Sequence, residues 1–345
     1  FFPADADPDD PDVLRLLAEN YDNVERSVKG CGFDYVGAAY INNVDGARQD
    51  GSAWLPELLR RHNMEWVAAE AINFLESNSD APFFLYMAPT LVHSPSAIRS
   101  LESDPRATPR GYIDIPDVMP SRESVMQRAR ASQAATPERS NLDKAAASIW
   151  LDDGVGAVLD KIDELGLTDN TLVVLASDNG NVAKFSCYDG GARLPMLARW
   201  PGVIQPGSTC GQLVSHLDFA PSFFEVAGAE PPAEMTLDGI SILTAMRGDP
   251  SYRRDSLFLE ITTERAVVTD ENLKYIAVRY LPEIWDRVQS GERFSHWGKP
   301  IAESTHTFDA VAQDGGVITA DELARVTAAN LHEEFARVVN TDDLL

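Results

Sequence analysis

The chain has 345 residues, of which 44% are hydrophobic and 24% are charged, as in ordinary globular proteins, so wholesale disorder is not expected. Its 54 acidic and 29 basic residues give a formal net charge of -25. This charge argues against a nucleic-acid binder and against docking on anionic lipid, because both need a basic face. No stretch approaches the roughly 18 uninterrupted apolar residues of a membrane span. The 3 cysteines are too few for a disulfide framework or a zinc site.

The first elements predicted along the chain are two helices and a strand. Helical patterning covers Val13–Lys29 and Met64–Glu76, with apolar residues recurring at helix spacing. The short apolar run Phe83–Met87 predicts a buried strand, and His93 follows shortly after its end. Residues 100–140 are polar and rich in Pro, Arg and Ser, which predicts a long surface excursion.

A helix, a short turn and a strand are predicted next. Asn141 is placed to cap a helix that runs to about Leu165, and Gly166 is placed to end it. The apolar run Thr171–Ala176 then predicts a buried strand. This order is half of a parallel α/β unit.

Ser177-Asp178-Asn179-Gly180 ends that strand and is the most informative segment of the chain. Open α/β folds place their chemistry at this edge of the sheet. A carboxylate beside an amide oxygen suits a hard cation such as Ca²⁺ or Mg²⁺. Lys184 would then hold an anionic group against the cation. The alternative is a simple turn, for which Asp, Asn and Gly are the usual residues.

The pattern of predicted elements changes near residue 250. Before it, Met196–Trp200 reads as a strand and Leu217–Ala227 as a helix. After it, short alternating segments predict an antiparallel sheet, and residues 320–340 have helical patterning. Sugar subsites are one interpretation of the excursion at 100–140 and of the segment 280–307. The alternative is that the aromatic and imidazole side chains of the second segment belong to a core: Trp285, His296 and Trp297.

Eight segments together resemble the sulfatase family of the alkaline-phosphatase superfamily, in the order that the family has them. We expect structural roles for Asp152, Asp153 and Asp218 within them. The segments are Gly32-Phe33-Asp34, Phe83-Phe84-Leu85-Tyr86 through His93-Ser94-Pro95, Leu151-Asp152-Asp153-Gly154-Val155-Gly156 with Leu165-Gly166-Leu167-Thr168-Asp169-Asn170-Thr171, Ser177-Asp178-Asn179-Gly180, Tyr188-Asp189-Gly190-Gly191-Ala192-Arg193-Leu194-Pro195, Arg199-Trp200-Pro201-Gly202, Asp218-Phe219-Ala220-Pro221 and Asp238-Gly239-Ile240-Ser241.

The resemblance implies a fold and a set of roles. The expected fold class is an α/β sandwich with a large, mostly parallel central sheet flanked by helices, followed by a smaller antiparallel subdomain. We place the catalytic domain at residues 1–250 and the subdomain at 251–345. Asp178 and Asn179 match the family's Ca²⁺ (or Mg²⁺) ligands, Lys184 matches a lysine that contacts the sulfate, and His93 matches the histidine that reaches the bridging oxygen of the ester.

The departures from the family pattern predict a truncated chain. The family nucleophile is a Cys or Ser in a "C/S-x-P-S-R" motif, matured to formylglycine, and it lies upstream of the Gly32-Phe33-Asp34 turn; this motif is not in the sequence. The chain begins Phe1-Phe2-Pro3, with no Met and no secretory leader. We therefore expect an interior fragment, truncated at both ends and inactive alone.

The expected activity of the parent enzyme is hydrolysis of sulfate esters, with a sulfated small molecule or glycan as substrate. Two alternatives are a phosphonate or phosphodiester hydrolase of the same superfamily and a non-catalytic sulfatase-like binding protein. The resemblance implies a periplasmic or extracellular location. The sequence makes no prediction of the oligomeric state.

Overall fold

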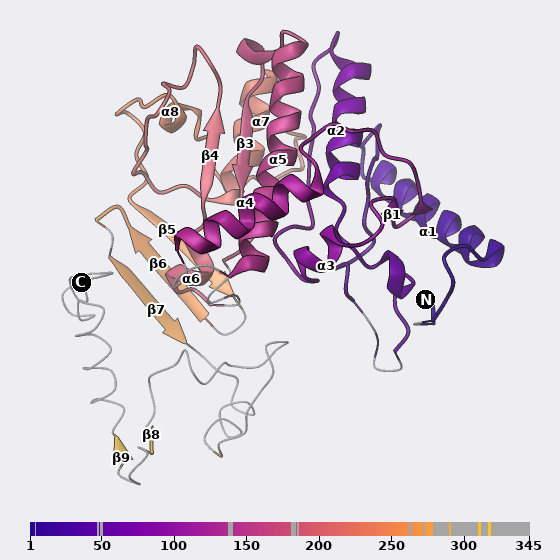
Figure 1. Ribbon diagram of the computed structural model, residues 1–345. Coiled ribbons are helices and arrows are strands. Elements are labelled where there is room, and N and C mark those ends of the chain that lie inside the picture. Colours follow the sequence, from indigo (N-terminus) through magenta and orange to yellow (C-terminus); the bar gives the residue numbers. More distant parts are fainter. Residues whose placement is uncertain are drawn as a thin grey trace. The chain divides into compact units, whose positions relative to one another are not determined.

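The computed structural model describes residues 1–278 except 4, 47, 49–50, 137–140, 181–183, 185, 262–263 and 272, and beyond them 290, 310–311 and 317–318. The chain divides into two compact units, residues 1–171 and 172–345 (Figure 1). The predicted boundary near residue 250 concerns the family's subdomain and stays a prediction.

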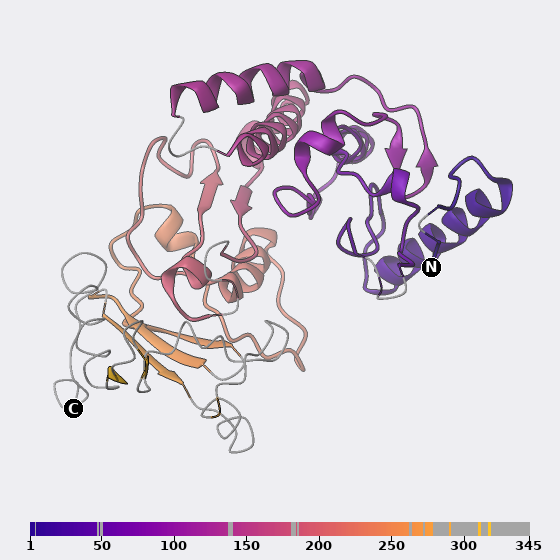
Figure 2. The same cartoon turned by 60° about the horizontal axis from the view of Figure 1, so that its bottom comes forward.

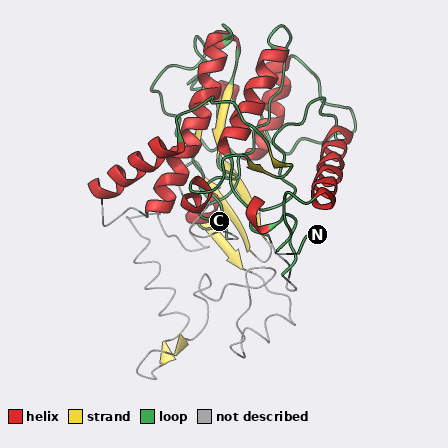
Figure 3. Cartoon of the chain, turned by 45° about the vertical axis from the view of Figure 1, so that its right-hand side comes forward, coloured by secondary structure: helices red, strands yellow, loops and turns green. Residues whose placement is uncertain are grey.

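The first unit is mainly helical, and its helices are red in Figure 3. Its two short strands, β1 (Ala107–Thr108) and β2 (Gly111–Tyr112), pair antiparallel. Its helices are α1 (Pro11–Gly30), η1 (Glu57–Leu59), α2 (Met64–Asn78), α3 (Ala97–Leu101), α4 (Arg122–Ala135), α5 (Leu142–Glu164) and η2 (Thr168–Asn170).

Helix α5 forms where the sequence predicts it. The Asn141 side chain accepts hydrogen bonds from the backbone N–H groups of Asp143 and Lys144, which would otherwise lack partners at a helix start. Gly166 has φ +70°, a conformation that favours glycine and ends the helix. Trp150, which is fully buried, anchors the core that α5 forms with α2 and α4.

The long surface excursion predicted at residues 100–140 is wrong in its second half, where helix α4 forms. Ser121 caps this helix by accepting a hydrogen bond from Ser124 N, and Val125, Met126 and Ala129 are buried against α5. Figures 1 and 2 show α4 lying across α5. The spacing of these three apolar residues is helical, but the surrounding Arg, Ser and Gln residues obscured it.

The predicted buried strand Phe83–Met87 is also wrong. The segment is assigned no strand, and its side chains alternate in exposure, with Phe84 57% and Tyr86 71% exposed. A strand needs a neighbouring strand to satisfy its backbone groups. No strand pairs with this segment among the described residues.

The second unit contains the remaining sheets. All strand pairs that the structure describes are antiparallel, including β3 with β4, so the expected parallel sheet is not seen in them. The elements are β3 (Val173–Ala176), α6 (Asp189–Ala192), β4 (Met196–Arg199), η3 (His216–Asp218), α7 (Phe219–Ala227), α8 (Leu243–Met246), β5 (Ser256–Ile261), β6 (Glu264–Thr269), β7 (Lys274–Val278), β8 (Ala310–Val311) and β9 (Val317–Ile318).

The pairing of β3 explains why it is less buried than predicted. Leu175 of β3 lies opposite Leu197 of β4, and both are exposed. A two-stranded ladder offers little apolar cover. The strand forms at Val173–Ala176, within the predicted range Thr171–Ala176, but none of its residues is fully buried.

The antiparallel sheet after residue 250 is confirmed. Strands β5, β6 and β7 form one sheet in this order, drawn in orange in Figure 2. The predicted helix at 320–340 and the aromatic segment at 280–307 lie outside the described residues, apart from residue 290. Within the described part of the chain, no helix has the length and apolar character needed to cross a membrane.

Candidate active site

His93 lies in the loop between α2 and α3 and is exposed. Its backbone N–H donates to the carbonyl oxygen of Thr90 at 3.2 Å, and its ring Nδ1 lies 3.0 Å from the hydroxyl of Ser94. Among the described residues, the ring is contacted through Nδ1. Nε2 is thus the ring atom available to a ligand.

His62 holds this loop, and the sequence reading missed it. Its ring is fully buried, with Nε2 at 3.0 Å from the carbonyl oxygen of His93 and 2.9 Å from that of Pro95. Nδ1 lies 2.7 Å from the hydroxyl of Thr90. The two carbonyl oxygens can only accept, so Nε2 carries the proton and Nδ1 accepts from Thr90. Burial lowers the pKa of His62, while its hydrogen bonds to the two carbonyl groups act in the opposite direction.

Asp178 and Asn179 follow β3 directly, in the second unit, as the sequence predicts. Asp178 is exposed and Asn179 is half-buried. The amide Nδ2 of Asn179 donates to Oδ2 of Asp178 at 2.6 Å, and the hydroxyl of Ser177 donates to the carbonyl oxygen of Asn179 at 2.8 Å. The two side chains therefore lie together at the end of the strand.

Gly180 packs this strand end against the Gly-Gly turn. Its N–H donates to the carbonyl oxygen of Gly191 at 3.0 Å. A Cβ at position 180 would lie 1.9 Å from the carbonyl oxygen of Gly190, so no other residue fits without a shift of backbone. A glycine is therefore needed at position 180 for this close approach.

Lys184 is half-buried, and the segment after it is tied to β6 and β7. The N–H of Cys187 donates to Oε2 of Glu264 at 2.7 Å. Nζ of Lys274 donates to the carbonyl oxygen of Cys187 at 2.9 Å and to Asp189 at 2.5 Å. Burial, and then the charge of Glu264, raise the pKa of the Cys187 thiol, so this thiol stays protonated at neutral pH.

The oxygens of Asp178 and Asn179 are of the type that binds a hard divalent cation, but two donors are too few for a complete site. Carboxylate and amide oxygens are the donors that Ca²⁺ and Mg²⁺ prefer, and Ca²⁺ takes about six to eight of them. No group of three or more His, Cys, Asp or Glu side chains with metal-site geometry occurs among the described residues. A cation bound here would need further oxygen donors, and the Asn179 amide, whose Nδ2 now faces Asp178, would have to turn its oxygen toward the ion.

Asp218 has a structural role, as expected. It is fully buried, and its carboxylate accepts from Arg254 at 2.6 and 2.8 Å. It also accepts from the backbone N–H groups of Ser215 and Ile240 at 2.6 and 3.0 Å. These bonds satisfy a buried carboxylate and connect three separate segments.

The structure brings Asp178 and Asn179 together in the second unit, which also holds Lys184. It places His93 in the first unit, where its loop depends on His62.

Comparison with known families identifies the family of the chain. The Sulfatase family model matches residues 17–229, which include His93, Asp178, Asn179 and Lys184. The model of the N-sulphoglucosamine sulphohydrolase C-terminal region matches residues 178–285. The chain belongs to the sulfatase family, and its fold class is α/β with an antiparallel sheet toward the C-terminus.

Curated relatives carry the same family name. The chain is 27% identical over 243 residues to a sulfatase of Formosa agariphila, a match that covers 63% of this chain and 40% of that protein. It is 31% identical over 220 residues to human arylsulfatase A, covering 59% and 36%. It is 44% identical over 88 residues to an ulvan-active sulfatase of Formosa agariphila, covering 26% and 17%. The match thus spans well under half the length of these relatives.

Solved structures match less closely. One, described as a complex with its substrate D-glucosamine-2-N,6-O-disulfate, is 19% identical with a TM-score of 0.46, covering 62% of this chain and 60% of that chain. Another, a complex with k-i-k-neocarrahexaose, is 23% identical with a TM-score of 0.44, covering 65% and 49%. Because both TM-scores are low, the family assignment depends on the sequence matches.

Proposed function

We propose that the full-length protein hydrolyses sulfate esters, with Asp178, Asn179, Lys184 and His93 in its active site. The observation that carries this proposal is the sulfatase match over residues 17–229, which contains all four side chains. The glycine-packed strand end supports a site at Asp178, because Gly180 fixes the backbone directly after the two oxygen donors.

Each side chain has a role that suits its chemistry. The amine of Lys184 would neutralise charge on the sulfate. The ring of His93 would hold a proton at Nε2 and donate it to the leaving alcohol, while its Nδ1 contacts Ser94. A divalent cation, held by the oxygens of Asp178 and Asn179, would offset the negative charge of the sulfate oxygens.

The nucleophile is not assigned to any residue of this chain. The expected formylglycine needs a Cys or Ser in a "C/S-x-P-S-R" motif, and the sequence contains none. The buried Cys187 does not fit this role, because Tyr188 and Asp189 follow it in place of the motif. We therefore expect the 345-residue chain alone to be inactive, and a full sulfatase rate from it would contradict that expectation.

A sulfated carbohydrate is the substrate class that we propose. The names of two relatives favour it: an ulvan-active sulfatase and the N-acetylgalactosamine-6-sulfatase of the mouse, which is 26% identical over 244 residues. An exported location would suit such a substrate and is proposed with it.

The test is turnover by the full-length protein of an aryl sulfate, a sulfated oligosaccharide and an aryl phosphonate monoester. We expect the sulfate esters to be hydrolysed faster, and we expect His93→Asn and Lys184→Met to lower kcat by about 100-fold or more. Arg15→Gln, on the exposed face of α1, is the control and should leave kcat unchanged. Preference for the phosphonate would favour the alternative hydrolase, and binding of glycans without any turnover would favour a non-catalytic protein.

A further inference from the structure

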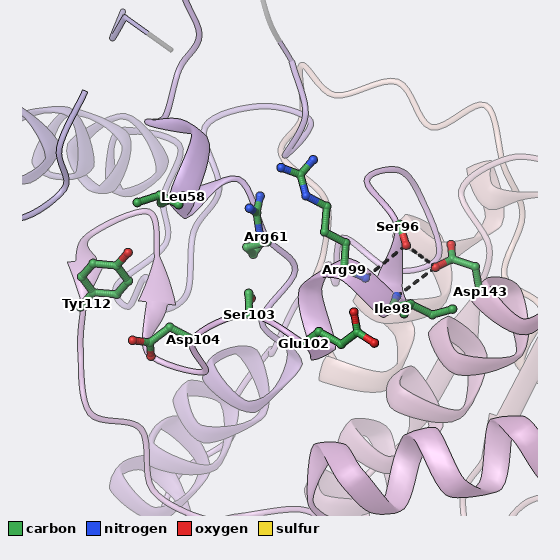
Figure 4. A pocket seen from close by; sticks show the side chains of 10 residues that line it. All are labelled: Leu58, Arg61, Ser96, Ile98, Arg99, Glu102, Ser103, Asp104, Tyr112 and Asp143. Atoms are coloured by element: carbon green, nitrogen blue, oxygen red, sulfur yellow. Dashed lines mark hydrogen bonds between the residues drawn. The ribbon is translucent and has the colours of Figure 1, made fainter. Parts of the chain in front are cut away.

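A pocket lies in the first unit, and part of its lining is close along the chain to His93. Its volume is about 630 Å³, a size typical of small-molecule sites (Figure 4). Ser96, one of its lining residues, lies three positions after His93 and donates to Asp143 at 2.5 Å. The residues that line the pocket are Leu58, Arg61, Ser96, Ile98, Arg99, Glu102, Ser103, Asp104, Tyr112 and Asp143.

Arg61 brings an uncompensated charge to this pocket. It is only 7% exposed, and it forms no ion pair with any described residue. Its Nη1 donates to the carbonyl oxygens of Glu57 and Arg60 at 2.9 and 2.7 Å, while its buried Nε has no partner within the described part of the chain. A buried guanidinium without a carboxylate is unusual, because burial of a charge is costly unless it is paired.

Two further arginines increase the positive charge beside Arg61. Arg60 and Arg99 both pair with the single carboxylate of Glu57. Two of the three guanidinium groups thus share one carboxylate, and that of Arg61 has none among the described residues. Burial, followed by the charges of Arg99 and Arg60, lowers the pKa of Arg61.

The other parts of the pocket offer different chemistry. In Figure 4 the guanidinium groups of Arg61 and Arg99 lie on one side of the view, and the carboxylates of Glu102 and Asp104 lie on the other. Glu102 is exposed and forms no ion pair with the described residues, whereas Asp104 pairs with Arg106 at 2.8 Å. The half-buried ring of Tyr112 also lines the pocket. A ligand that satisfies all these groups carries an anionic group for the arginines, hydroxyl donors for the carboxylates and an apolar face for Tyr112.

We propose that this pocket binds an anionic sugar residue, with its sulfate or carboxylate on Arg61 and Arg99 and its hydroxyl groups on Glu102 and Asp104. A pyranose ring supplies the hydroxyl donors and an apolar face for Tyr112. The proposal deepens the proposed function, on which it rests for the choice of a sugar: the substrate would carry a second acidic group besides the sulfate ester that is cleaved.

The test is calorimetric binding of monosaccharides to the 345-residue chain, without any turnover. The probes are D-glucose 6-sulfate and D-glucuronate, which distinguish a sulfate from a carboxylate, together with uncharged D-glucose and inorganic sulfate. We expect at least one acidic sugar to bind at least about tenfold more tightly than glucose and than inorganic sulfate. Arg61→Gln and Arg99→Gln should each weaken this binding by about tenfold or more.

Arg99→Gln keeps the test valid if Arg61→Gln destabilises the chain, because the Arg99 side chain is 53% exposed. Arg15→Gln removes the same charge from an exposed ion pair on α1 and should leave binding unchanged. Equal binding of glucose or of inorganic sulfate, no binding of either acidic sugar, or binding that survives Arg99→Gln would overturn the proposal. Failure of sulfate-ester turnover with intact, arginine-dependent sugar binding would count against the proposed function alone.

Discussion

Replacement of His62 by Ala tests how the loop that carries His93 is held. The substitution removes three contacts of a fully buried ring, at 2.7 Å to Thr90, 3.0 Å to His93 and 2.9 Å to Pro95. At about 1 kcal/mol for each hydrogen bond, these contribute about 3 kcal/mol. The cavity left by the ring adds about 1 kcal/mol or more. We expect the free energy of unfolding of the first unit to fall by about 4 kcal/mol.

Urea unfolding, followed by the fluorescence of the buried Trp66 and Trp150, measures this change. His93→Ala is the matched control, because it removes an exposed imidazole from the same loop and should cost less than about 1 kcal/mol. A loss below about 1 kcal/mol for His62→Ala, or equal losses for the two variants, would show that His62 does not hold the loop.

The pH dependence of the free energy of unfolding gives a second measure of the contribution of His62. Burial lowers the folded-state pKa of His62 below the ordinary value of about 6.5, so the unfolded chain takes up its proton first as the pH falls. The stabilising contribution is therefore complete above about pH 6.5 and is lost as the pH falls through the folded pKa. The slope contributed by His62 reaches at most about 1.4 kcal/mol per pH unit, and His62→Ala should remove it. An unchanged slope in the variant would refute this reasoning.

Two further substitutions test the second unit. Asp218→Asn should lower the free energy of unfolding by about 3–5 kcal/mol, because it leaves the charge of Arg254 buried without its partner. Asp189→Asn breaks a half-exposed pair with Lys274 and should lower the free energy of unfolding by about 1 kcal/mol or less. Thermal unfolding of both variants measures the difference. Gly180→Ala should displace the Gly190–Gly191 turn and broaden or shift its backbone NMR signals, since the new Cβ would meet the carbonyl oxygen of Gly190 at 1.9 Å. Gly156→Ala, in α5 with nothing within 4 Å of the new Cβ, should stabilise the chain by about 0.5–1 kcal/mol, and a destabilised Gly156→Ala with an unaffected Gly180→Ala would contradict both expectations.

The sequence predicts the elements whose stabilising contacts are local. The Asn141 cap and the Gly166 stop depend on neighbours within a few positions, and each strand after residue 250 pairs with the next strand along the chain. All three are confirmed. A strand at Phe83–Met87 would need a partner strand from a distant part of the chain. The composition of this segment does not show whether such a partner exists. Helix α4 was missed because three buried apolar residues are a weak signal among many polar ones.

In the candidate site, too, local contacts follow from the sequence and long-range contacts do not. Asp178 and Asn179 are adjacent in the chain, so their contact follows from the sequence itself. The role of His62 depends on a loop some thirty residues away, and no local pattern marks it. The pocket at Arg61 is likewise built from separate segments, and only the structure brings them together.

Calorimetric titration of the folded, full-length protein with Ca²⁺ and Mg²⁺ examines the central claim most directly. We expect uptake of one ion that Asp178→Ala abolishes and Asn179→Ala weakens, while Asp189→Asn, in the neighbouring turn, leaves it intact. Absence of ion binding in the folded protein, or binding that persists unchanged in Asp178→Ala, would contradict the account.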